Sequence, residues 1–383
     1  MHVRVRTACA ALMVLGLTAG PLAGSALAAP STAAVVRETT DPDTAKALRA
    51  ALKGLPDKDA TAALVRVGGT DGSWRGSAGV HDLASKRKAV EHARFRAGST
   101  TKVVTAAVVL QLAAEGRIDL DGHVQTYLPG LLSKAFEPIT VRQLLTYTSG
   151  LKPGASLGDV NGEGYERRFE TLTPEEVVAA SVAAGPAFRP GDRQQYANID
   201  YTVLGLLIEK VTGDSYEHQA AVRVLRPAGM RHTSFPGGPD PRIHGPHNRG
   251  YQKLADGRLV DATEWNMSDR WAAGDMISTT ADLERLLFAL FRGRLVPQPL
   301  LEKEMFTLPK VPGATMSAGL QRYELDDGTV LWLKTGARPG YGTLLAGTRD
   351  LSRTLVYSVN ATDAKAEEMN PVAERIVRAA FVR

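Results

Sequence analysis

The sequence predicts an α/β protein, of the α+β kind, whose sheet is built from both ends of the chain around a mostly helical middle. Two short, partly alternating runs lie near the start, at 62–67 and 74–80, and a glycine-rich turn joins them. Strand patterns return after residue 319, and long apolar runs with helical spacing lie between. Because 44% of the 383 residues are hydrophobic and 23% are charged, the chain can bury a core of ordinary size.

The first segment has the features of a secretory signal peptide. Arg4 and Arg6 precede an apolar stretch at 8–17, and Ala26 and Ala28 place small residues where a signal peptidase cuts. We therefore expect a signal peptide over 1–28, cut after Ala28, and a secreted protein. The apolar stretch is shorter than the ~20 residues that cross a bilayer, so we expect no stable membrane anchor.

The folded part is expected to begin after residue 41. Residues 29–41 are small and polar without periodicity and predict a flexible leader. Apolar residues from 43 to 55 then recur at helical spacing and predict a first helix. We interpret 42–383 as a single domain with a sheet lobe from both ends and a helical lobe at roughly 99–300.

The later elements follow from the same periodicities. The helical lobe is expected to contain long helices over 99–115, 174–184, 199–212 and 280–291. The end of the chain is expected to form strands at 320–325, 330–333, 341–348 and 354–359, and a closing helix at 370–382.

Composition excludes several kinds of function. The single cysteine, Cys9, lies in the signal segment, which leaves no disulfide framework, thiolate metal site or cysteine nucleophile. The 46 Lys and Arg residues against 41 Asp and Glu give a charge of +5, too evenly spread for a nucleic-acid surface. We expect no nucleic-acid partner, no metal and no cofactor, and we expect a monomer.

A candidate nucleophile lies at the start of the first long apolar helix. Ser99 and Lys102 are three residues apart, and so share one face of that helix. A lysine in a dry site near other cations can act as a base toward a serine hydroxyl, and N–H groups at the helix start can hold an oxyanion. Ser85 and Ser149 also precede a lysine at this spacing, but only Ser99 opens a long apolar helix.

A second candidate pair is Tyr196 and Asn198, just before the helix that begins near residue 199. A phenol close to two ammonium groups would have a stabilised anion, so Tyr196 is a candidate general base or proton shuttle for Ser99. Asn198 offers an amide that could hold both Lys102 and a substrate carbonyl. Taken alone, the tripeptide would equally fit a helix-capping turn.

A third candidate set follows the strand at 330–333. Lys334 would add positive charge, Thr335 a hydroxyl for a substrate carboxylate, and Gly336 room for close backbone approach. The Ala337 N–H could be a second oxyanion donor, and Arg338 could bind a carboxylate through a bidentate pair. Lys-Thr-Gly is also a common strand-to-turn sequence, and Arg338 could equally be a solvated turn residue.

The three motifs occur in the order Ser-x-x-Lys, Tyr-x-Asn, Lys-Thr-Gly. This set resembles the serine β-lactamase and penicillin-binding protein superfamily. Tyr-x-Asn points to the branch with class C β-lactamases, secreted D-alanyl-D-alanine carboxypeptidases and β-lactamase-like esterases. The segments at 95–102, 139–150, 188–213 and 272–279 are similar too, so the resemblance runs from about Val65 to about Thr348. It implies an antiparallel sheet flanked by helices, with the site in the cleft beside the helical lobe.

The resemblance implies a Ser99 acyl-enzyme and a peptidoglycan peptide ending in D-Ala-D-Ala as substrate. A class C-like β-lactamase is the first alternative, followed by an esterase or D-amino-acid amidase, and by a non-catalytic module that binds wall peptides or β-lactams. Two residues depart from the family pattern. Tyr147 stands where His is common, which we interpret as a packing change, and Lys334 stands where the secreted carboxypeptidases often have His.

Two weaker signals are set aside. Gly154 to Gly158 fits the G-x-S-x-G pattern of another hydrolase fold, but its flanks predict a loop rather than a strand and a helix. His244 and His247 lie close together in the sequence without an obvious third metal ligand.

Overall fold

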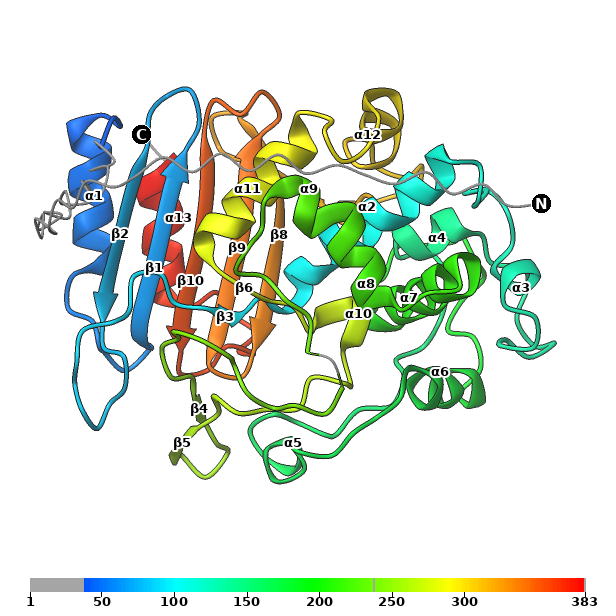
Figure 1. The fold of residues 1–383 in the computed structure, drawn as a ribbon, viewed down its shortest axis with the longest axis horizontal. Coiled ribbons are helices and arrows are strands. Elements are labelled where there is room, and N and C mark those ends of the chain that lie inside the picture. The colour runs from blue at the N-terminus through cyan, green and yellow to red at the C-terminus, as the bar shows by residue number, and fades with distance from the viewer. Residues whose placement is uncertain (1–37, 237, 382–383) are drawn as a thin grey trace, which may run out of the picture. The chain divides into compact units, whose positions relative to one another are not determined.

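The computed structural model describes residues 38–236 and 238–381, within which the chain forms a six-stranded antiparallel sheet (Figure 1). The strand order is β2-β1-β10-β9-β8-β7, so the two ends of the chain meet where β1 pairs with β10. The strands are β1 (Ala60–Gly68), β2 (Trp74–Gly79), β7 (Gln321–Glu324), β8 (Val330–Arg338), β9 (Tyr341–Thr348) and β10 (Thr354–Ala361).

Two helices from opposite ends of the chain cover one face of this sheet. They are α1 (Pro42–Leu52) and α13 (Pro371–Phe381). The α1 helix starts where the Asp41 side chain accepts a hydrogen bond from the Thr44 N–H at 2.8 Å. Its buried residues, among them Leu48 and Leu52, share a cluster with α13 and this face of the sheet.

The segment between β2 and β7 is mostly helical and lies to the right of the sheet in Figure 1. Two short antiparallel pairs interrupt it, β3 (Phe95–Arg96) with β6 (Ile277–Ser278) and β4 (Tyr251–Lys253) with β5 (Leu259–Asp261). Its helices are η1 (Gly98–Thr100), α2 (Thr101–Ala114), α3 (Val124–Tyr127), α4 (Val141–Leu145), α5 (Glu163–Glu166), α6 (Pro174–Ala183), α7 (Asn198–Thr212), α8 (Tyr216–Ala220), η2 (Ala221–Leu225), α9 (Arg226–Ala228), α10 (Trp271–Gly274), α11 (Thr280–Phe291) and α12 (Gln298–Glu304).

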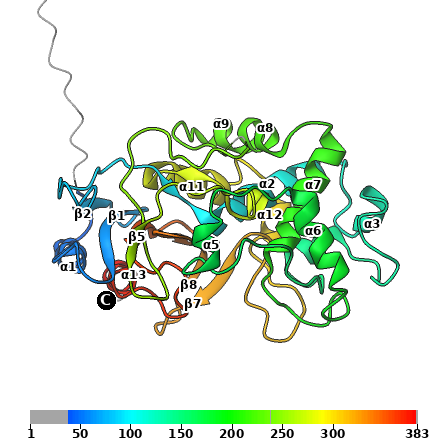
Figure 2. The same ribbon diagram turned by 90° about the horizontal axis from the view of Figure 1, so that it is seen from below.

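The sheet is apolar on both faces, because α11 and the helical segment cover the face opposite α13 (Figure 2). Side chains alternate between the two cores along each strand, as the pleat requires. On β10, Leu355 and Tyr357 belong to the core under α1 and α13, whereas Val356 belongs to the core on the helical side. The strands are therefore held from both faces, which fixes the position of β8.

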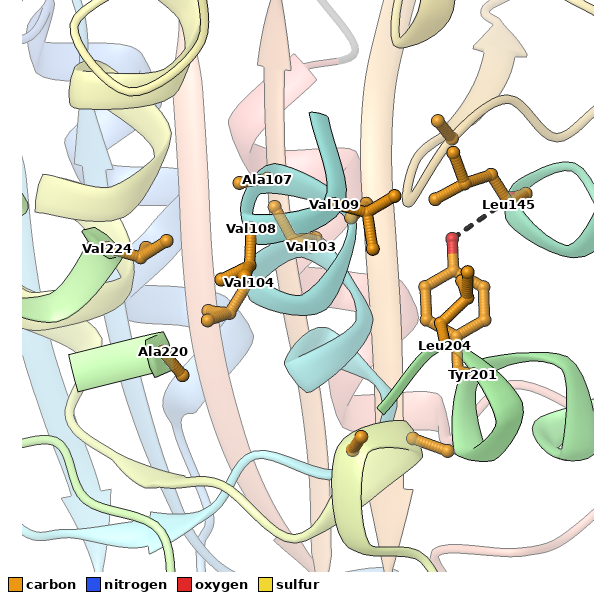
Figure 3. Packing of buried hydrophobic residues seen from close by; sticks show 14 of the residues in the cluster. Val103, Val104, Ala107, Val108, Val109, Leu145, Tyr201, Leu204, Ala220 and Val224 are labelled. Carbon is orange, nitrogen blue, oxygen red and sulfur yellow. Dashed lines mark hydrogen bonds between the residues drawn. The ribbon is translucent and has the colours of Figure 1, made fainter. Parts of the chain in front are cut away.

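The α2 helix runs through the middle of the larger core, and its residues are buried almost all round. Figure 3 shows Val104 and Val108 directed toward Ala220 and Val224, and Val109 on the side of α7. On α7, Tyr201 donates a hydrogen bond to the Leu145 carbonyl oxygen at 3.0 Å. Such packing leaves α2 little freedom to rotate, so the residues at its start are held in one orientation.

The predicted fold class is confirmed, and most predicted elements agree with the structure within a few residues. The long helices are observed as η1 with α2, α6, α7 and α11. The predicted signal peptide and residues 29–37 of the leader lie outside the described residues, so both stay predictions. In the described part of the chain, no helix has the length and apolar run needed to cross a membrane.

Candidate active site

Ser99 lies in η1, directly before α2 and beneath the free edge of β8. Gly98 has a left-handed backbone (φ 54°), and a Cβ there would lie 2.7 Å from the Ala337 nitrogen. Glycine is therefore required for η1 to approach β8 this closely. The hydroxyl of Thr100 donates to the Ala97 carbonyl at 2.9 Å and that of Thr101 to the Gly98 carbonyl at 2.7 Å, which fixes the turn around Ser99.

Lys102 is fully buried one helical turn after Ser99. Its Nζ lies 3.3 Å from the Ser99 Oγ, 2.7 Å from the Asn198 Oδ1 and 2.6 Å from the Ala273 carbonyl oxygen. Burial lowers the pKa of Lys102 well below its usual range, and the nearby charge of Lys334 lowers it further. A neutral amine has two N–H groups, which Asn198 and Ala273 accept, so its lone pair faces Ser99. This arrangement suits a base.

Tyr196 precedes α7, and its hydroxyl donates a hydrogen bond to the Ser99 Oγ at 2.8 Å. Although 39% of the residue is exposed, its hydroxyl is directed inward. Burial raises the pKa of Tyr196 to about 12, while the hydrogen bond to Ser99 and the charge of Arg270 act in the opposite direction. The expected stabilised phenolate is therefore not what the geometry favours. Tyr196 is placed as a protonated phenol that can donate a proton.

Asn198 is the first residue of α7 and joins the two proton-handling groups. Its Oδ1 accepts from the Lys102 Nζ, as the sequence predicted. Its Nδ2 is then the end of the amide that can donate to a substrate carbonyl.

Lys334 is buried on the face of β8 that points toward Tyr196. Its Nζ lies 5.0 Å from the centre of the Tyr196 ring and donates to the Thr335 carbonyl oxygen at 3.0 Å. Burial lowers the pKa of Lys334 to about 7. Its charge therefore changes near neutral pH.

The strand pairing directs the Ala337 N–H toward the site. The hairpin between β8 and β9 has Arg338 opposite Tyr341, and Ala337 opposite Gly342. In a two-residue hairpin the pair next to the turn is hydrogen-bonded and the following pair is not, so Ala337 directs its N–H away from β9. A Cβ on Gly336 would lie 3.0 Å from the Ser99 nitrogen. The backbone N–H groups of Ser99 and Ala337 are thus close enough to share one oxyanion.

These residues surround a pocket of about 370 Å³. Its wall includes Ser99, Tyr196, Lys334, Thr335, Gly336 and Ala337, which the sequence brought forward as candidates. Sequence reasoning missed Lys365, which comes from the loop after β10, and the apolar Met316 and Leu320. No short motif marks these residues, because loops far along the chain bring them to the site.

Arg338 does not line this pocket, contrary to its expected role as a carboxylate ligand. Its side chain is buried, and its Nη2 donates to the Asp269 Oδ1 at 3.2 Å. The β8 strand has passed the pocket by this residue, and the guanidinium pairs with a buried carboxylate instead. The position that a substrate-binding cation could occupy is filled by Lys365.

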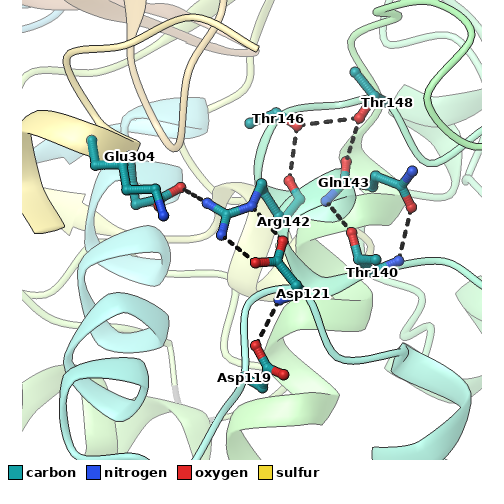
Figure 4. A network of polar contacts seen from close by, with 9 residues as sticks. Asp119, Asp121, Thr140, Arg142, Gln143, Thr146, Thr148 and Glu304 are labelled. Atoms are coloured by element: carbon teal, nitrogen blue, oxygen red, sulfur yellow. Dashed lines mark hydrogen bonds and ion pairs between the residues drawn. The ribbon is translucent and has the colours of Figure 1, made fainter. Parts of the chain in front are cut away.

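Tyr147 also lines the pocket, and its ring lies 4.9 Å from the Tyr196 ring and 5.3 Å from the Tyr201 ring. The expected packing role fits this stack, and its left-handed backbone (φ 58°) shows how tightly the segment is constrained. Figure 4 shows the polar network that anchors it, in which Arg142 binds Asp121 and Glu304.

Buried behind Lys102 is another ionisable group that the sequence did not suggest. Asp200 lies on α7, is fully buried, and accepts a hydrogen bond from the Ser149 hydroxyl. Burial raises the pKa of Asp200 well above its usual range. Ser149, which matched the Ser-x-x-Lys spacing, therefore has a structural partner.

The two weaker signals do not form sites of their own. The segment at 152–159 is a loop, as its flanks predicted. His244 contacts Asp240 at 2.6 Å, and nowhere in 38–236 or 238–381 do three or more His, Cys, Asp or Glu residues gather as a metal site would need.

Comparison with known proteins identifies the family. The β-lactamase family profile matches residues 46–378, most of the chain. The chain belongs to the β-lactamase family. It is thereby a member of the serine hydrolase superfamily that the motif order resembled, and the resemblance is confirmed.

Individual members of this superfamily are similar to the chain over different lengths. A D-stereospecific amidohydrolase from Streptomyces sp. is 31% identical, with a TM-score of 0.78 over 88% of this chain and 98% of that one. The D-amino acid amidase from Ochrobactrum anthropi SV3 has the same fold at 24% identity, with a TM-score of 0.73 over 87% and 97%. The putative penicillin-binding protein PbpX of Bacillus subtilis is 28% identical over 72% of this chain, and the match spans 64% of that relative.

Proposed function

We propose that this β-lactamase-family protein is a secreted D-alanyl-D-alanine carboxypeptidase, which releases the C-terminal D-residue of a wall peptide through a Ser99 acyl-enzyme. The charge of the pocket carries this proposal. Lys334 and Lys365 line it, and none of the described residues in its wall is acidic. A free carboxylate next to the scissile bond complements this charge, whereas the ammonium group of an amino-acid amide is repelled by it.

Acylation follows from the placed protons. The Lys102 amine takes the Ser99 proton as Oγ attacks the substrate carbonyl, and the Ser99 and Ala337 N–H groups hold the oxyanion. Tyr196 donates its proton to the leaving nitrogen and regains one from Lys102. The products are a free C-terminal amino acid and an ester on Ser99.

Deacylation uses the same groups with water in the place of the leaving amine. Water loses a proton to the Tyr196–Lys102 relay as it attacks the ester, and Ser99 recovers its hydrogen. Lys334, Lys365 and Thr335 hold the substrate carboxylate before the first step, and Asn198 donates to the carbonyl of the preceding residue.

A D-amino-acid amidase is the second candidate, because the Streptomyces protein that is 31% identical is named a D-stereospecific amidohydrolase. That name supports D-configured substrates in both cases. The two candidates differ in whether the substrate carries a carboxylate or a neutral amide after the scissile bond.

The deciding experiment compares four substrates with the protein lacking residues 1–28. They are diacetyl-Lys-D-Ala-D-Ala, its L-Ala-ended counterpart, D-phenylalanine amide and benzylpenicillin. We expect D-Ala release from the first, at least tenfold slower release from the second, and a lasting penicilloyl adduct on Ser99 by intact-mass spectrometry. Faster hydrolysis of the amide would favour the amidase, and penicillin turnover without an adduct a β-lactamase. No turnover of any substrate would contradict the proposal.

The pH dependence tests the carboxylate-binding role of Lys334. Its pKa of about 7 means that it is cationic below neutral pH and loses that charge above it. The ratio of kcat/KM for the D-Ala-ended peptide to that for its C-terminal amide should therefore fall as pH rises through about 7, by about tenfold overall. The ratio cancels the titration of Lys102, which acts on both substrates. In Lys365→Gln the ratio should be lower throughout with the same midpoint. A ratio that is flat from pH 5.5 to 9 would exclude this role for Lys334.

A further inference from the structure

The catalytic pocket adjoins a second, larger cavity on the face of the sheet under α13. This cavity, here called the outer groove, has a volume of about 950 Å³, and Gln321 and Thr335 line both spaces. A molecule bound at Ser99 can therefore extend into the outer groove without leaving the protein surface.

The outer groove is an uncovered extension of the second core. Its walls include Leu333 of β8, Leu344 of β9 and Phe381 of α13, all of which belong to or pack against that core. Tyr323 and Met369 also line it, with 51% and 54% of their surface exposed, which makes them two of the most exposed large apolar residues in the described chain. Exposed apolar area gathered in one concave place is typical of a binding site.

The end of β7 opens the passage between the two spaces. The β7 strand pairs with β8 only from Val330 to Leu333, so the edge of β8 is open from Lys334 onward. Side chains alternate between the faces at this edge, with Lys334 buried on the catalytic side and Thr335 exposed beside the outer groove. The passage thus begins at the residues that hold the substrate carboxylate in the proposed function.

The two spaces carry opposite charge. The wall of the outer groove includes Asp326, Asp327, Glu368 and Glu374, while Arg378 is bound to Glu374 at 2.8 Å. The catalytic pocket carries Lys334 and Lys365. A carboxylate is therefore favoured at the catalytic end, and a neutral or basic apolar group in the outer groove.

We propose that the outer groove binds the side chain of the leaving residue and selects large, apolar D-amino acids there. This inference rests on the proposed function, since it places the C-terminal carboxylate at Lys334 and Lys365 and the side chain past Thr335. The occupant is a neutral aromatic or aliphatic side chain, such as that of D-Phe or D-Leu, and the enzyme accordingly prefers such a residue over D-Ala.

The test compares diacetyl-Lys-D-Ala-D-Phe with diacetyl-Lys-D-Ala-D-Ala, which share the acyl part and the carboxylate. We expect kcat/KM for the D-Phe peptide to be higher by roughly tenfold or more, because the ring leaves water on binding. The double variant Tyr323→Ser, Met369→Ser should lose most of this preference and keep its activity on the D-Ala peptide. The matched control is Phe169→Ser, Leu259→Ser, which removes equally exposed apolar residues at 50% and 44% elsewhere and should keep the preference.

The outcomes separate this inference from the proposed function. Cleavage of both peptides at equal rates, or a preference that survives the double variant, would overturn the outer groove and leave the carboxypeptidase intact. If neither peptide is cleaved, the proposed function fails, and binding of N-phenyl-1-naphthylamine by fluorescence still tests the groove. The probe should bind wild type and not the double variant, and equal binding would overturn the site. A dimer in light scattering that the double variant dissociates would also overturn it, by assigning this face to a second copy.

Discussion

Ser99→Ala, Lys102→Met and the double variant should all lower kcat to the same residual level, a loss of roughly 10⁴ to 10⁶-fold. The two residues act as one unit, because the Lys102 amine is useful only as acceptor of the Ser99 proton at 3.3 Å. Methionine fills the buried site of Lys102 without a charge, so the fold should be retained. Release of D-Ala and formation of the penicilloyl adduct measure the loss.

A matched control is available at another Ser-x-x-Lys spacing in the chain. Ser85 donates to the Asp82 carboxylate at 2.5 Å in an exposed turn, and Lys88 lies close by. Ser85→Ala and Lys88→Met should leave kcat within about twofold. Losses that multiply in the Ser99 and Lys102 double variant would mean separate roles, and more than a tenth of wild-type activity in Lys102→Met would assign the base elsewhere.

The parts of the fold that depend on local pattern could be predicted from the sequence. The run after Ser99 is apolar on every face, which indicates a helix through the core, and α2 is such a helix. Because residues three apart share a helix face, the Ser99–Lys102 contact follows directly. The sheet was also predictable, since β1 and β8 to β10 are long enough for their alternation to be seen.

Contacts made by chance meetings of distant loops could not be predicted. The pairing of β3 with β6 involves two residues on each side, too few for a periodic pattern. The partner of Arg338 is Asp269, which is 69 positions away and gives no signal in the sequence. Lys365 reaches the pocket from a loop for the same reason.

The pKa of Tyr196 illustrates a different limit. From the sequence, two nearby ammonium groups suggested a stabilised phenolate. In the structure, burial lowers the pKa values of both Lys102 and Lys334, so the charges expected to stabilise the anion are themselves weakened. Desolvation acts on every member of a buried cluster at once, and its size depends on packing that the motif does not contain.

Gly336→Ala should lower kcat by about 10²- to 10³-fold and the free energy of unfolding by about 2 kcal/mol. A Cβ at this position would lie 2.0 Å from the Ala97 carbonyl oxygen and 2.5 Å from the Thr343 Oγ1. These two atoms hydrogen-bond each other at 2.9 Å and join η1 to the sheet. Relief of the clash must move β8 away from η1, which separates the Ala337 N–H from that of Ser99. Turnover of an ester and a peptide, with urea unfolding, measures both effects.

Gly342→Ala is the control, because Gly342 faces Ala337 across the hairpin and a Cβ there meets only the Val359 carbonyl oxygen at 3.8 Å. It should change kcat less than about twofold. The loss in Gly336→Ala should be similar for ester and peptide, since both develop the same oxyanion, whereas a damaged carboxylate site would affect the peptide alone. If Gly336→Ala were destabilised but kept its kcat, the oxyanion would not be held between η1 and β8, and Ser99 would need another donor.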